Sequence, residues 1–178
     1  MGVTYQEAQY TLSYVWPDGD REAGAAARRF LRSILGVWGL VQRTADDVEL
    51  AASELISNAA EHAKGPYELL LRGTATQFVC AVRDCDPYVP VTPSSEAVSP
   101  ALPQLVEGTE ELAERGRGLR IVEHLFPGAW GFRPLGDGTK LAWIGAWPGG
   151  GEEGMFPPAL LDRFEVYSRT GQVGRLGR

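Results

Sequence analysis

Three groups of residues in this chain have the types and spacing that a binding or catalytic site requires. The first lies in residues 54–62, where Glu54, Asn58 and Glu61 would share one narrow face of a helix. A carboxylate and an amide oxygen aligned in this way could hold Mg²⁺, which prefers hard oxygen ligands. The alternative is a solvated polar stripe on an amphipathic helix, and the segment alone leaves both open.

Asp84 forms the second group, because it closes an apolar segment, residues 76–84, that has the pattern of a strand. A carboxylate that faces a pocket from a strand end can accept a hydrogen bond from an exocyclic amine such as that of adenine. The alternative is a turn aspartate whose side chain bonds to nearby backbone amides.

The third group is Gly116-Arg117-Gly118, followed by Leu119 at the start of an expected helix. Glycines let the backbone approach a phosphate, and the first turn of a helix offers free N–H groups. The alternative is a hinge between a loop and a helix. The sequence contains neither a P-loop nor the G-x-S-x-G motif of hydrolases.

The hydrophobic patterns predict the elements that must position these groups. Five segments have the pattern of strands: 8–16, 67–74, 76–84, 129–135 and 139–147. Three segments have helical periodicity: 21 to about 40, 44 to about 63, and 119–126. Thr44 followed by Asp47 resembles a capping box and is the expected start of the second helix. The order predicts an α+β fold, with helices on one face of a mostly antiparallel sheet.

Two segments differ in composition from the rest of the chain. Residues 85–115 hold five of the 12 prolines and form a long loop of the kind that serves as a lid or binding loop. Residues 148–178 begin as a glycine-rich linker and end in a tail. We therefore expect one domain over residues 1–147, with its lid at about 85–115.

Composition excludes several classes of function. The 178 residues include 17 Lys or Arg and 23 Asp or Glu, for a formal net charge of −6. This acidic balance argues against direct binding of nucleic acid. No apolar run reaches the ~18 residues of a membrane span, and two cysteines cannot form a disulfide framework. A cytoplasmic protein is expected, without a membrane partner.

The order of these motifs resembles the histidine-kinase-like ATPase superfamily, which has the Bergerat ATP-binding fold. The resemblance covers residues 10–147: Glu-x-x-x-Asn-Ala-x-x-His on a helix, Asp at a strand end, a lid, Gly-Arg-Gly-Leu, and Gly-Thr-Lys. It implies a two-layer α/β sandwich. Within the superfamily, the chain is most similar to anti-sigma-factor serine/threonine kinases and their actinobacterial relatives.

The resemblance assigns roles to the residues that match its motifs. It implies that Asn58 binds Mg²⁺ and that Glu54 is the base or the carboxylate that orients water. Asp84 would bind the amino group of adenine, with support from Thr139. His62 would belong to the ATP site in a mainly structural role. The phosphates would be lined by Gly116, Arg117, Gly118 and Leu119.

The function that the resemblance implies is a regulator that binds Mg-ATP and phosphorylates a Ser or Thr of a small antagonist protein. Its expected partners are that antagonist, a sigma factor, or both, and a second copy of the chain. Cys85-Asp86-Pro87 follows Asp84 where many relatives have Asp-x-Gly-x-Gly. This departure keeps open a non-catalytic module that switches partners with nucleotide. The catalytic part of a split sensor kinase is a third alternative.

Overall fold

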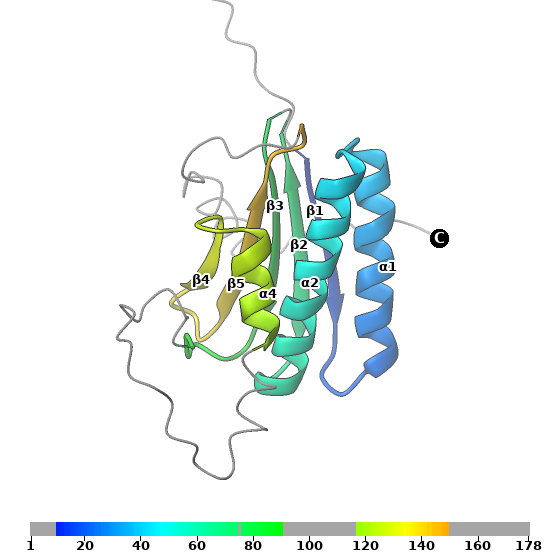
Figure 1. Ribbon diagram of the computed structural model, residues 1–178. Coiled ribbons are helices and arrows are strands. Elements are labelled where there is room, and N and C mark those ends of the chain that lie inside the picture. Colours follow the sequence, from blue (N-terminus) through cyan, green and yellow to red (C-terminus); the bar gives the residue numbers. More distant parts are fainter. Residues whose placement is uncertain (1–9, 75, 91–116, 150–178) are drawn as a thin grey trace, which may run out of the picture.

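Eight helices and strands form over residues 10–74, 76–90 and 117–149, which are the residues that this computed structural model describes. The strands are β1 Tyr10–Trp16, β2 Tyr67–Gly73, β3 Phe78–Asp84, β4 Trp130–Pro134 and β5 Lys140–Ala146. The helices are α1 Arg21–Val37, α2 Gln42–His62 and α4 Arg117–Leu125. Figure 1 shows the three helices side by side on one face of the sheet. The predicted α+β fold with two layers is confirmed.

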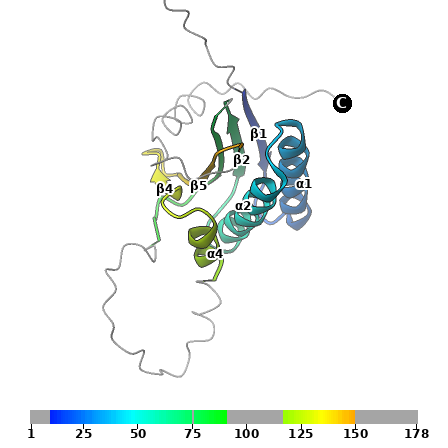
Figure 2. The same ribbon diagram turned by 45° about the horizontal axis from the view of Figure 1, so that its top comes forward.

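All neighbouring strands of the sheet are antiparallel, in the order β1-β2-β3-β5-β4. The consecutive strands β4 and β5 form an antiparallel hairpin. Gly136 and Gly138 have φ of 73° and 84° there, a conformation that favours glycine. Because β5 lies beside β3, Asp84 pairs with Lys140 across the two strands. Figure 2 shows β5 between β4 and the other strands.

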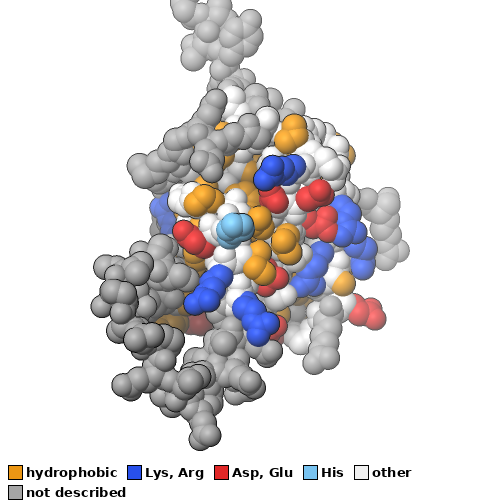
Figure 3. All heavy atoms as spheres, in the orientation of Figure 1, with side chains coloured by type: hydrophobic (Ala, Val, Ile, Leu, Met, Phe, Trp, Pro, Cys, Tyr) orange, Lys and Arg blue, Asp and Glu red, His pale blue; other side chains and the backbone are white. Residues whose placement is uncertain are grey.

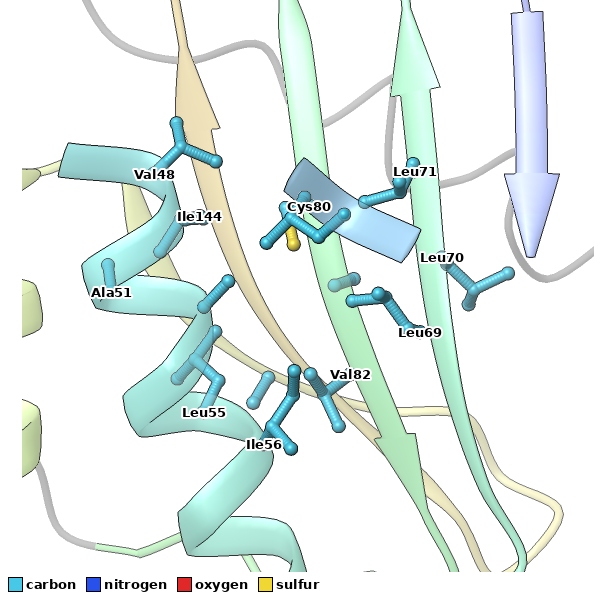
Figure 4. Packing of buried hydrophobic residues seen from close by; sticks show 14 of the residues in the cluster. Val48, Ala51, Leu55, Ile56, Leu69, Leu70, Leu71, Cys80, Val82 and Ile144 are labelled. Carbon is cyan, nitrogen blue, oxygen red and sulfur yellow. The ribbon is translucent and has the colours of Figure 1, made fainter. Parts of the chain in front are cut away.

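The core lies between α2 and the middle of the sheet. Small and branched residues recur at helical spacing in α2, so one face of this helix is fully apolar. Figure 4 shows this face of α2 packed against the sheet. The helix contributes Val48, Ala51, Leu55 and Ile56, and the strands contribute Leu69, Cys80, Val82 and Ile144. This packing fixes α2, and with it the neighbouring polar positions Glu54 and Asn58.

The starts of two helices differ from the prediction. The expected capping box at Thr44 is wrong, because α2 already begins at Gln42 and its N-cap is Val41, which makes no side-chain capping bond. The Val41 backbone N–H instead donates to the Pro148 carbonyl at 3.2 Å, and the Val41 carbonyl accepts from Ala45 at 3.0 Å. The third helix begins at Arg117, so Gly118 lies inside its first turn.

Charges of both signs share the face that the helices cover, as Figure 3 shows for the described side chains. Arg32 of α1, for example, forms an ion pair with Glu49 of α2. No helix in the described ranges is long and apolar enough to cross a membrane. Residues 91–115 of the expected lid and residues 150–178 of the expected tail lie outside the described residues.

Candidate functional site

The contact between α2 and α4 brings the first and third sequence groups together. Gly118 is buried in the first turn of α4. A Cβ atom built on Gly118 would lie 2.6 Å from Oε2 of Glu54 and 3.5 Å from Nδ2 of Asn58. Glu54 and Gly118 are 64 positions apart in the chain, and the absence of a side chain at Gly118 leaves room for the carboxylate of Glu54 in this position.

Asn58 carries a buried amide nitrogen without a hydrogen-bond partner in the part of the chain that the structure describes. Its Nδ2 atom is buried, and no described residue forms a hydrogen bond with it. Buried polar atoms in folded proteins are nearly always bonded, so an unpaired one calls for a ligand or another partner. Rotation of the amide exchanges its two ends, so Asn58 can present an oxygen to a cation or an N–H to a phosphate.

A cavity of about 250 Å³ lies beside this contact, between α2, α4 and the sheet. Its apolar lining includes Leu55, Ala59, Ala63, Leu119, Phe132 and Ala142. Its polar and titratable lining consists of Asn58, His62, Asp84, Asp86, Tyr88 and Lys140. Walls that combine apolar side chains with convergent polar groups are typical of small-molecule sites, and suit a flat aromatic ring with a polar edge.

Asp84 ends β3 and lies in the wall of this cavity, with only 2% of the residue exposed. Its Oδ1 atom accepts hydrogen bonds from Nζ of Lys140 and from the Asp86 backbone N–H, each at 2.9 Å. Burial raises the pKa of the Asp84 carboxyl, and the hydrogen bond from Lys140 opposes that rise. Asp84 therefore makes the backbone contact of a turn aspartate and also lines a pocket, so its contact with an amino group stays a prediction.

The structure places the other expected site residues in different surroundings. His62 is exposed at the end of α2 and lines the cavity, as Leu119 does from α4. Arg117 is exposed at the start of α4, and Gly116 lies outside the described residues. Glu61 lines a separate pocket with Asp18 and Arg28, so it does not join Glu54 and Asn58.

Thr139 does not line the cavity that contains Asp84. Its hydroxyl accepts a hydrogen bond from Nε of Arg83 at 3.1 Å and donates one to Asp137. Nη2 of Arg83 also contacts Oδ2 of Asp137 at 2.7 Å. Thr139 thus belongs to a polar network at the β4–β5 hairpin, and its support of an adenine contact at Asp84 stays a prediction.

Lys140 and Asp86 are cavity residues to which the sequence analysis gave no role. Side chains alternate along extended backbone, so Thr139, which directly precedes β5, and Lys140, the first residue of β5, lie on opposite faces of the sheet. The pairing of β3 with β5 puts Lys140 on the face of Asp84. The sequence shows which side chains of a strand alternate, but it does not show that β3 is the neighbour of β5 in the sheet.

Comparison with protein families matches residues 19–128, more than half of the chain, to the histidine kinase-like ATPase domain. The chain belongs to this family, which confirms the superfamily that the motif order indicated. A search of curated proteins found no match. The family supports an ATP-binding regulatory function.

Proposed function

We propose that this protein binds ATP with Mg²⁺ and acts as a serine/threonine protein kinase of the anti-sigma-factor type. The observation that carries the proposal is the position of Glu54 and Asn58 against Gly118, beside the cavity walled by Asp84. One helix supplies a carboxylate and an amide, and a second begins at that point with a buried glycine. A nucleotide with its metal needs donors and acceptors of these kinds.

In the proposed complex the adenine ring lies in the cavity and its amino group donates to Asp84. The phosphates lie at the first turn of α4, where backbone N–H groups have no partner within the helix and where the helix dipole favours anions. The unpaired amide of Asn58 fits a metal ligand at this place. Mg²⁺ bound there would neutralise phosphate charge.

The proposed reaction is transfer of the γ-phosphoryl group to a Ser or Thr of an antagonist protein. The hydroxyl oxygen forms a bond to the γ-phosphorus, the bond from that phosphorus to the bridging oxygen breaks, and ADP leaves. Glu54 accepts the hydroxyl proton, a role that suits a half-buried carboxylate at the phosphate end of the site. The sigma factor, the antagonist and a second copy of the chain are the proposed partners, in the cytoplasm.

Calorimetry with ATP, ADP and GTP, with and without Mg²⁺, tests the binding half of the proposal. We expect binding of the adenine nucleotides that strengthens with Mg²⁺. Incubation with radiolabelled ATP and co-purified partner proteins then tests transfer, and label on a Ser or Thr of a partner is the expected result. Absence of adenine-nucleotide binding would refute the whole proposal.

A nucleotide-gated switch without phosphoryl transfer is the second candidate. Asp86, which stands where many relatives have glycine, favours it, because this residue adds a second carboxylate to the cavity wall. In that case ATP binds and changes the affinity for a partner, but no label appears on any partner. The two candidates therefore differ in one measurement on the same purified proteins.

A further inference from the structure

Lys140 occupies an unexpected place in the cavity wall. Its Nζ atom donates to Oδ1 of Asp84 and to the backbone carbonyl of Asp86, each at 2.9 Å. A second carboxylate oxygen, Oδ2 of Asp86, lies 3.7 Å from the same nitrogen. The side chains of Lys140 and Asp84 are only 8% and 3% exposed, so this ion pair is shielded from solvent.

We propose that Lys140 is a positioning residue that sets base selectivity, because it holds Asp84 as a pure hydrogen-bond acceptor facing an amino group of the nucleotide base. The inference rests on the proposed function, since it concerns the base of the nucleotide that the cavity takes. It adds a role for a residue that does not itself need to touch the base.

The two carboxylate oxygens of Asp84 have different roles: one accepts hydrogen bonds from the protein, and the other can accept one from a ligand. Oδ1 already accepts from Lys140 and from the Asp86 N–H, which fixes the plane of the carboxylate. No described residue donates to Oδ2. One oxygen therefore holds the side chain in place, and the other is free to accept a donor from a bound molecule.

The charge on Asp84 decides which base that oxygen accepts. An ionised carboxylate has no proton to donate, so it accepts from an amino group and repels a carbonyl oxygen. A neutral carboxyl has one donor and one acceptor, and so can pair with either group. ATP and ITP present this difference, because adenine has an amino group at position 6 and hypoxanthine has an oxygen there.

Burial and the nearby Asp86 carboxylate both favour the neutral form of Asp84, and the ammonium of Lys140 opposes them. The other titratable side chains in the cavity wall are His62 and Tyr88, and both are exposed. Removal of the Lys140 charge should therefore let Asp84 hold a proton and accept either base.

The test measures competition of ATP and ITP for a fluorescent ATP analogue on the full chain. The parent should bind ATP at least ~100-fold more tightly than ITP. In Lys140→Met this ratio of affinities should fall by at least ~10-fold. Lys140→Arg keeps a positive charge and should restore most of the preference. Lys64→Met is the matched control, because Lys64 is the only other lysine and is exposed.

Lys140→Met leaves Asp84 buried without its partner and can fail to fold. The double variant that combines Lys140→Met with Asp84→Asn removes both charges. Its amide at position 84 offers a donor and an acceptor, so the ratio of ATP to ITP affinity should be small in this variant as well. A folded Lys140→Met or double variant with the parent's preference would overturn this inference alone. A parent that binds neither nucleotide would instead refute the proposed function, and the inference with it.

Discussion

The carboxylate of Asp84 accepts a hydrogen bond within a turn and also lines the cavity. Asp84→Asn replaces a charged acceptor by an amide, so ATP binding should weaken by about 1.5–3 kcal/mol, the contribution of a hydrogen bond to a charged group. Calorimetry measures the change. Asp46→Asn, on an exposed side chain of α2, is the control and should bind like the parent. Equal ATP affinity in Asp84→Asn and the parent would remove the adenine contact from the proposal.

A substitution at Glu54 distinguishes a kinase from a nucleotide-gated switch. Glu54→Gln keeps the size of the side chain but removes the carboxylate that accepts a proton. ATP should bind nearly as in the parent, while phosphoryl transfer to the partner should fall by ~10²- to 10⁴-fold. Radiolabelled ATP with the partner protein gives the rate.

The matched control for this experiment is Glu61→Gln. Glu61 lies on the same helix, is exposed and lines a different pocket, so its variant should transfer at the parent rate. Equal label from Glu54→Gln and the parent would exclude Glu54 as the base. No label from the parent, with ATP binding intact, would favour the nucleotide-gated switch.

At the scale of elements, the site depends on how closely α4 approaches α2. Gly118→Ala adds a Cβ atom that would lie 2.6 Å from Oε2 of Glu54, so the carboxylate end of the Glu54 side chain must move. ATP binding should weaken, although alanine favours a helix over glycine by ~1 kcal/mol. Calorimetry and thermal unfolding measure the two effects separately.

Gly36→Ala is the control for that substitution. Gly36 is an exposed residue of α1, and a Cβ atom there would have no neighbour within 4 Å. We expect this variant to raise the free energy of unfolding by about 0.4–1 kcal/mol and to leave ATP binding unchanged. If Gly118→Ala behaves like Gly36→Ala in both measurements, the close approach has no role in the site.

At the scale of the whole molecule, Tyr67 links the segment between α2 and β2 to Asp18, which lies 49 positions earlier in the chain. Its hydroxyl, at the start of β2, contacts Asp18 at 2.8 Å and the carbonyl of Ala63 at 3.1 Å. Burial, followed by the hydrogen bond to Asp18, raises the pKa of Tyr67 from its ordinary value of 10.0 to about 12. The stabilisation that belongs to this group is therefore complete below pH 10 and is lost as the pH rises towards 12.

Urea unfolding between pH 8 and pH 12 tests this link. The parent should lose stability above pH 10 more steeply than Tyr67→Phe, which has no hydroxyl to ionise. Tyr88→Phe, at an exposed position, should follow the parent. Parallel curves for the parent and Tyr67→Phe would contradict the role of this buried hydroxyl.

Sequence alone determined the elements and the family, because both depend on patterns within short segments. Alternation and helical periodicity located every described strand and helix to within a few residues. The motif order indicated the superfamily that the family comparison then confirmed. The start of α2 was missed, because the Val41–Pro148 contact joins residues far apart in the chain.

Only the tertiary structure decided which side chains meet in the site. Asp84 and Lys140 are 56 positions apart, and they form an ion pair because β3 and β5 are neighbours in the sheet. The same pairing turns Thr139 to Arg83, and helix packing sets Gly118 against Glu54. A local pattern can give the face on which a side chain lies, but its partner depends on strand order and helix approach, which are set by packing of the whole chain.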